Sequence, residues 1–172
     1  LSRFFNFFMK LLGKNYIEKI KGIKFGYHNY EGILAYPIII LTLIDYYLFL
    51  PKNLIFFSKF INKNSNKFLI IDRYLTDTIC DLIISTKKPK LVCKLFSHQI
   101  LFLKKIIKVI FLYCDYKVVM IRTPEIKFDR SYKDKMKAYK FVKEFFQFKV
   151  FETSNSSIES ISEDIFEQIK NV

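Results

Sequence analysis

The chain has 172 residues and a formal net charge of +13, from 29 Lys and Arg against 16 Asp and Glu. This length fits one domain, and a hydrophobic content of 51% is enough to build a core, which excludes an intrinsically disordered chain. A basic balance ordinarily indicates an anionic partner. The abundant Lys, Ile, Phe, Asn and Tyr all have A/T-rich codons, so genome composition is an alternative source of the charge.

The cysteines and the N-terminal residues indicate the cellular compartment of the protein. Cys80, Cys93 and Cys114 are odd in number and lie in apolar or helical contexts, which predicts neither a disulfide framework nor a metal site and favours a reducing compartment. The first residues lack a cleavable signal sequence, so we expect a cytoplasmic protein. The chain begins with Leu1 inside helical sequence, which is typical of a fragment.

The first third of the chain predicts mainly helices. Apolar residues recur at helical spacing over 1–12, and Gly13 stands where such a helix would end. Residues 14–32 read as an irregular surface segment. Two helices then follow, over 33–49 and 51–62, separated at a proline.

The apolar stretch 33–50 is the one part of the sequence with the length of a membrane span. It contains Pro37, Asp45 and two tyrosines, and a central aspartate costs about 3 kcal/mol on insertion. A buried helix of a globular domain is therefore the preferred interpretation.

Two short apolar runs and a third short segment predict strands of a parallel sheet. The run 68–71 leads directly into Asp72 and Arg73, the run 118–121 leads into a helix start at Pro124, and a third strand is expected over 149–152. Ser156 and Glu159 form a capping-box pattern, and isoleucines at helical spacing predict a terminal helix. Strands alternating with helices indicate an α/β fold.

Asp72 and Arg73 carry the strongest chemical signal. Ligands bind at the carboxyl ends of strands in open α/β sheets, and phosphoryl transfer needs a held Mg²⁺ together with cations that neutralise phosphate oxygens. A carboxylate and a guanidinium at one strand end supply both. The alternative is an ion pair or a helix cap without a ligand.

Several segments resemble the thymidylate kinase-like family of P-loop nucleotide kinases. "FLIIDRYLTDTICDLI" is similar to the family's strand with its Asp-Arg-Tyr element, and "YKVVMIRTPEIKFDRS" resembles its second strand, helix start and lid arginine. "KAYKFVKEFF" looks like the helix after the lid, and "KVFETSNSSIESISEDIFEQI" like the last strand, the loop near adenine and the closing helix. The resemblance implies one domain over 1–172, with a three-layer, P-loop NTPase-like parallel sheet flanked by helices.

The sequence lacks the phosphate-binding loop of that family. Gly13, Lys14 and Asn15 do not form one, because the pattern needs glycine five positions before Gly13, where Phe8 stands, and Ser or Thr after the lysine. The opening "LSRFFNFFMKLL" resembles the helix that follows the loop. We therefore expect the first strand and the loop to lie upstream of Leu1, and a chain without them to be inactive.

The resemblance assigns roles to particular residues. It places Asp72 near Mg²⁺ through water, Arg73 on the transferring or acceptor phosphate, and Tyr74 and Asp77 in the acceptor pocket. Arg130 corresponds to the lid arginine, and the segment from Thr153 through Ser154 to Asn155 borders the adenine. His28 is a candidate substrate contact from the residues alone, against the alternative of an ordinary surface or core histidine.

The resemblance implies an ATP- and Mg²⁺-dependent phosphotransferase that acts on a nucleoside monophosphate, dTMP or a related acceptor. The expected partners are small nucleotides, with no nucleic acid and no membrane, and the resemblance leaves room for a homodimer. The rival is a non-catalytic basic module that binds nucleic acid or a membrane surface. The lysines of 133–143 with interleaved aromatics fit that rival, and they also fit a solvated helix face beside a lid.

Overall fold

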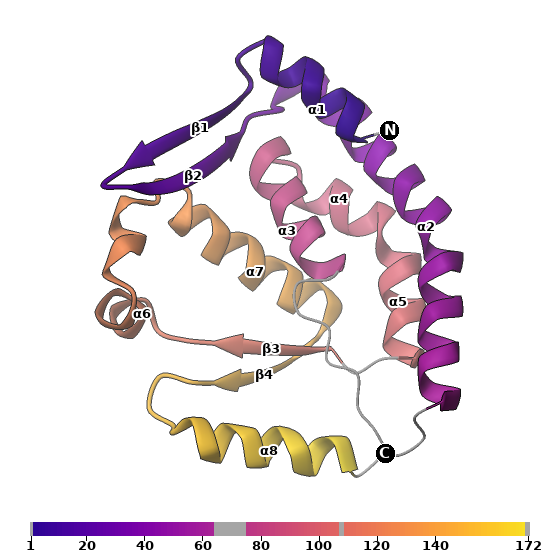
Figure 1. Ribbon diagram of the computed structural model, residues 1–172, viewed down its shortest axis with the longest axis vertical. Helices are drawn as coiled ribbons and strands as arrows, with labels where there is room; N and C mark the ends of the chain where they lie inside the picture. The colour runs from indigo at the N-terminus through magenta and orange to yellow at the C-terminus, as the bar shows by residue number, and fades with distance from the viewer. Residues whose placement is uncertain (1, 64–74, 107–108, 171–172) are drawn as a thin grey trace. The chain divides into compact units, whose positions relative to one another are not determined.

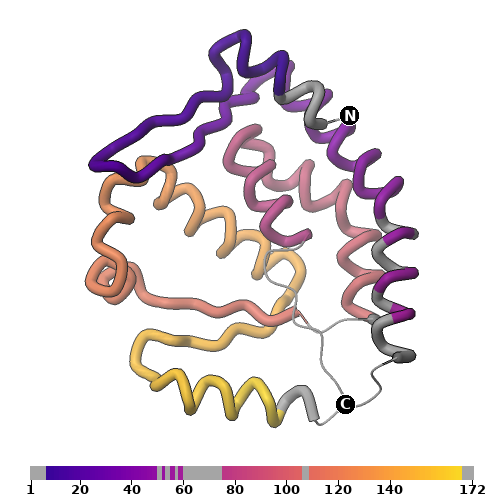
Figure 2. The backbone as a smooth tube through the Cα atoms, viewed as in Figure 1, coloured from indigo at the N-terminus to yellow at the C-terminus, as the bar shows by residue number. Residues whose placement is uncertain are grey.

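The computed structural model describes residues 2–63, 75–106 and 109–170, which form a mixture of helices and short strands (Figures 1 and 2). The chain divides into two compact units, Leu1–Glu18 with Gly26–Phe96, and Lys19–Phe25 with Ser97–Val172. The predicted strand 68–71 lies outside the described residues. So do Asp72, Arg73 and Tyr74.

The first unit is mainly helical. Its helices are α1 (Ser2–Leu11), the short η1 (Gly32–Leu34), α2 (Ala35–Lys63), α3 (Leu75–Thr86) and α4 (Pro89–Leu95). Helices α1 and α3 pack against α2, and α4 packs against α3. The long helix α2 is therefore the element on which this unit is assembled.

Helix α1 confirms the prediction for residues 1–12, including its end at Gly13. Gly13 has φ = 67°, a left-handed conformation that costs glycine little. Its amide donates to the Lys10 carbonyl at 3.1 Å, and the Lys14 amide donates to the Met9 carbonyl at 2.8 Å. These two bonds form a Schellman motif, which satisfies the last carbonyls of the helix.

The prediction of an irregular segment over 14–32 was wrong, because most of it is a β-hairpin. Strands β1 (Asn15–Ile20) and β2 (Ile23–His28) pair with each other. They are joined by Lys21 at φ = 49° and Gly22 at φ = 88°. Two successive residues with positive φ are the requirement of the two-residue turn that matches strand twist. Gly22 belongs to this turn and Gly26 to the strand after it.

Helix α2 also differs from the prediction, since one helix replaces the two expected over 33–49 and 51–62. It continues through Pro51, where the missing amide removes one backbone hydrogen bond. The segment Gly32–Phe49, made of η1 and the first half of α2, is long and apolar enough to cross a membrane by length and composition, a test that core helices of soluble proteins also pass. Only 17% of that segment is buried, so the expected buried helix is buried on one face alone.

The second unit contains the remaining elements. They are the hairpin tip, α5 (Ser97–Ile106), β3 (Ile110–Tyr113), α6 (Tyr116–Arg122), η2 (Pro124–Phe128), α7 (Tyr132–Phe146), β4 (Lys149–Glu152) and α8 (Ile158–Lys170). Strands β3 and β4 pair in parallel, with Ile110 opposite Lys149 and Tyr113 opposite Glu152. Because the two strands run parallel, their carboxyl ends meet at one edge, and α6, η2 and α7 form the crossover between them.

The prediction of a strand over 118–121 was wrong, since those residues lie in α6. The strand β3 lies just upstream. Asp115 is the N-cap of α6, and its side chain accepts from the Lys117 amide at 2.8 Å. This cap starts a helix before the second apolar run is reached. The expected helix start at Pro124 is confirmed as the first turn of η2.

The last two predicted elements are confirmed. Strand β4 has the expected bounds, 149–152, and α8 follows it. The cap of α8 is shifted by one residue from the expectation, because the Ser160 amide donates to the Ser157 hydroxyl at 3.2 Å and Ser156 precedes the cap.

An aromatic cluster holds β3, β4 and the end of α7 together. The Phe148 ring stacks on Phe111 at 5.2 Å and contacts Phe146 at 5.8 Å, and Phe111 also contacts Tyr139. From α5, the Lys104 ammonium donates to the Phe146 carbonyl at 3.0 Å and lies over the Phe148 ring. These contacts fix the entry of the chain into β4.

The fold is thus a mixture of helices and short sheets. In the described part of the chain, the sheets are the pairs β1–β2 and β3–β4. A P-loop NTPase-like sheet of several parallel strands stays a prediction.

The three cysteines give a chemical test of this fold. All are free, and Cys80 and Cys93 are fully buried whereas Cys114 is half-buried. Burial raises the pKa of the Cys80 thiol well above its usual range, and that of Cys93 to about 12. Since the thiolate is the reactive form, we expect a disulfide reagent to modify Cys114 first in the native protein, and all three cysteines in denaturant. Mass spectrometry identifies the modified cysteines. Rapid modification of Cys80 or Cys93 under native conditions would contradict this packing.

Candidate functional site

The candidate site lies at the edge of the second unit where β3 and β4 end. The Thr153 amide and hydroxyl both donate to the Tyr113 carbonyl, at 2.7 and 3.0 Å. Two residues after Tyr113 and one residue after Thr153, the Asp115 amide donates to the Ser154 hydroxyl at 2.7 Å. The two loops are therefore tied together immediately beyond the parallel strands, where α/β proteins place their ligands.

Two tyrosines line this edge and link it to the start of α7. The Tyr116 ring lies 5.6 Å from the Tyr132 ring. Desolvation raises the pKa of Tyr132, and the nearby Cys114, Tyr116, Tyr113 and Asp129 raise it further. Tyr132 is thus close to the residues that follow β3, and the lid arginine predicted from the sequence stands two positions before it.

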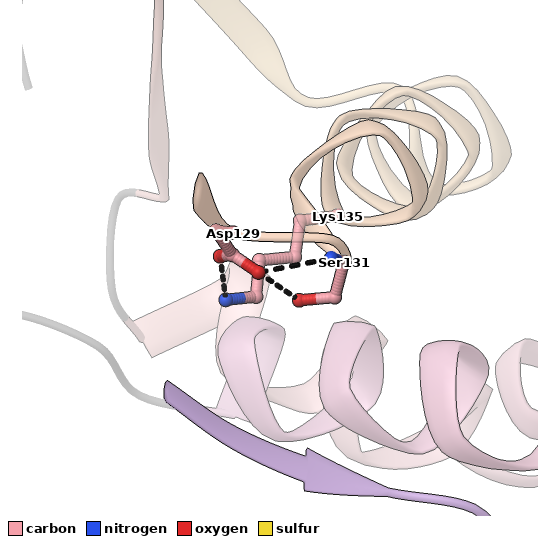
Figure 3. Close-up of polar contacts among 3 residues, drawn as sticks. All are labelled: Asp129, Ser131 and Lys135. Carbon is pink, nitrogen blue, oxygen red and sulfur yellow. Dashed lines mark hydrogen bonds and ion pairs between the residues drawn. The ribbon is translucent and has the colours of Figure 1, made fainter. Parts of the chain in front are cut away.

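Arg130 stands between Asp129 and Ser131, which form a hydrogen-bond network with Lys135 (Figure 3). Asp129 accepts from the Ser131 amide at 2.9 Å and from its hydroxyl at 2.7 Å, and Lys135 donates to the other carboxylate oxygen at 2.7 Å. Desolvation acts to raise the pKa of Asp129, but the bonds from Lys135 and Ser131 outweigh it and hold the pKa below its usual value. The flanking residues are thereby fixed, and Arg130 itself is exposed.

His28 and Asp77 belong to the first unit. His28 ends β2, where its Nδ1 lies 3.0 Å from the Asn15 side-chain oxygen and 3.5 Å from the Tyr30 hydroxyl, and its ring stacks on Tyr30. Asp77 lies in the first turn of α3, one turn before Asp81. The Asp81 carboxylate acts electrostatically on His28, so the end of β2 and α3 are close.

The pKa of His28 gives a pH test of this cluster. Desolvation lowers it from the ordinary 6.5, against an opposing effect of Asp81. Below pH 6.5 the unfolded chain therefore binds a proton that folded His28 resists, and stability falls as the pH decreases toward the lowered folded value. We expect the free energy of unfolding of His28→Gln, measured by urea unfolding, to decrease less than that of the parent between about pH 7.5 and pH 5.5. Parallel pH profiles for the two proteins would contradict the assignment.

The structure thus describes some of the predicted site residues and not others. Thr153 and Ser154 lie at the strand edge in bonded positions, Asn155 is exposed beside them, and Arg130 follows a fixed turn of the same unit. Asp72, the predicted Mg²⁺ residue, lies outside the described residues with Arg73 and Tyr74. Among the residues that are described, no group of three or more His, Cys, Asp or Glu gathers to hold a metal ion.

Sequence reasoning missed the contributions of Tyr113, Asp115 and Tyr116. The available signal was the apolar run 109–113 followed by an aspartate two residues later, which is a strand followed by a helix cap. The strand was assigned instead to the second apolar run, 118–121, which begins eight residues after the start of β3.

Comparison of the chain with protein-family models, with curated proteins and with solved structures gives no match.

Proposed function

We propose that this chain is part of an ATP-dependent phosphotransferase of the thymidylate kinase-like kind. Its acceptor would be a nucleoside monophosphate, dTMP or a related molecule. The observation that carries the proposal is the edge of β3 and β4, where bonds from Thr153 to Tyr113 and from Asp115 to Ser154 join two strand-end loops.

This edge suits the base and ribose of a nucleotide. Tyr113 and Tyr116 are 41% and 39% exposed, so each offers an aromatic face on which a base could stack. Asn155 adds an exposed amide with both donors and an acceptor. The Asp115 carboxylate already caps α6, so it serves the architecture rather than a metal.

The phosphate chemistry would come from residues assigned by sequence. Bound Mg²⁺ would neutralise phosphate oxygens, with Asp72 holding it through water. Arg73 would contact the transferring or acceptor phosphate, and Arg130 would cover the donor phosphates, because a guanidinium matches two phosphate oxygens at once.

Photolabelling with 8-azido-ATP tests the adenine assignment on the chain itself. Trypsin releases residues 109–117 and 150–170 as single peptides, one from each strand-end loop. We expect these two peptides to carry the label and unmodified ATP to suppress it. Ser154→Ala should weaken the labelling, whereas Ser156→Ala, an exposed serine of the same loop, should leave it unchanged.

A different distribution would count against the proposal. Label spread over the lysine-rich peptides, without competition by ATP, would indicate charge attraction alone. Equal labelling of the Ser154 and Ser156 variants would remove the strand-end loop from the site.

A further inference from the structure

The outer face of α2 carries exposed apolar side chains along much of the helix. We define the outer stripe as Ile40, Ile44, Tyr47, Leu48 and Ile55, which are 39–65% exposed. Their spacing of three, four and seven residues puts them on one side of an α-helix. On the opposite side, Ala35, Ile38 and Ile39 are buried. One helix thus has two apolar faces, of which only the inner one is covered.

The neighbouring helix α1 also exposes apolar side chains. Helix α1 packs against α2 and lies alongside its first half (Figure 1). Phe7 and Leu11 of α1 are 59% and 69% exposed. An exposed apolar stripe of this kind marks a site of interaction, since soluble monomers seldom expose a large apolar patch.

The charges of the same two helices have one predominant sign. Helix α1 contains Arg3 and Lys10 and no acidic residue. Helix α2 contains three lysines and a single acidic residue, Asp45. Lys52 and Lys59 are exposed and, by helical geometry, lie along one margin of the outer stripe.

We propose that the outer stripe of α2 lies in the surface of an anionic lipid bilayer, parallel to the membrane plane. Apolar side chains enter the boundary between headgroups and acyl chains, tyrosine favours that depth, and lysines reach the acidic headgroups. The buried inner face and the packing of α1 and α3 on α2 oppose a spanning orientation, which would expose every face of the helix to lipid.

Other occupants fit these residues less well. A second copy would bring together two chains that each carry +13. Nucleic acid would use the lysines but leave the isoleucines and Leu48 in water. An acidic bilayer matches both the charge and the apolar area.

Vesicle flotation of the whole chain tests the proposal. We expect binding to vesicles of phosphatidylcholine with about one third phosphatidylserine, and weaker binding to phosphatidylcholine alone or at high salt. The double variant Ile40→Ser with Leu48→Ser should bind about tenfold more weakly. The matched control, Ile121→Ser with Ile158→Ser, replaces two exposed isoleucines of the second unit and should bind as the parent does.

A tryptophan reporter keeps the test decisive if the double variant folds poorly. The chain has no Trp, and Tyr47 and Tyr16 are 53% and 51% exposed. Brominated lipid should quench the fluorescence of Tyr47→Trp and leave that of Tyr16→Trp, in the β1 strand, unquenched.

Three results would overturn the proposal. They are absent or stripe-independent vesicle binding, a dimer that the stripe substitutions dissociate in the absence of lipid, and salt-sensitive DNA binding without any vesicle binding. Nucleotide photolabelling of residues 150–170 should be the same in the stripe variants, so the bilayer and phosphotransferase proposals can fail separately.

Discussion

Phe148→Ala should lower the free energy of unfolding by about 3–4 kcal/mol. The Phe148 side chain is only 7% exposed, stacks on Phe111, contacts Phe146 and lies beneath the Lys104 ammonium. Its removal leaves a cavity between α7 and the two strands, and these neighbours can close it only in part. Urea unfolding monitored by circular dichroism measures the change.

Phe145→Ala is the matched control, because it makes the same chemical change three positions away. Phe145 is 44% exposed and contacts Phe141 and Phe146. We expect a loss of about 1 kcal/mol or less, since alanine also favours the helix. Equal losses in the two variants would mean that the aromatic cluster does not hold β4. With β4 loosened, Phe148→Ala should also reduce nucleotide labelling of residues 150–170.

Arg73→Ala should lower the kcat of phosphoryl transfer by about 10²–10³-fold. The measurement requires a longer form of the protein that contains a phosphate-binding loop, since the 172 residues include no such loop. The guanidinium is assigned to an oxygen whose negative charge grows in the transition state, so the loss should appear mainly in kcat. Steady-state kinetics with ATP, Mg²⁺ and dTMP gives both parameters.

Arg73→Lys separates charge from geometry in this prediction. Lysine keeps the positive charge but loses the two-pronged arrangement of donors, so its rate should lie between those of the parent and the alanine variant. An unchanged kcat in Arg73→Ala would refute the assigned role. It would leave the adenine assignment at β3 and β4 open, because photolabelling tests that separately.

The sequence predicted α1, β4 and α8, whose boundaries depend on residues close to each boundary. Helix α1 ends at Gly13 because a left-handed residue is needed there. Strand β4 has the bounds predicted for it, and α8 follows from its isoleucine spacing. In each case the decisive residues lie within a few positions of the boundary.

The candidate site depended on pairing between distant segments. Two apolar runs, 109–113 and 118–121, are equally suited to a strand in isolation. Pairing with 149–152 selects the first, and the Asp115 cap makes the second a helix. Only this choice brings Tyr113 and Asp115 to Thr153 and Ser154.

The sequence by itself determined the mixed helical and strand composition, the terminal helices and the polar loop after β4, since these follow from residue spacing and capping. The tertiary structure decided the hairpin, the identity of β3, the continuity of α2 through Pro51 and which face of α2 is covered. The physical reason is that strand pairing and burial are properties of two segments at once. The spacing of apolar residues shows which face of a segment can be buried, whereas the segment that packs against it determines which face is buried.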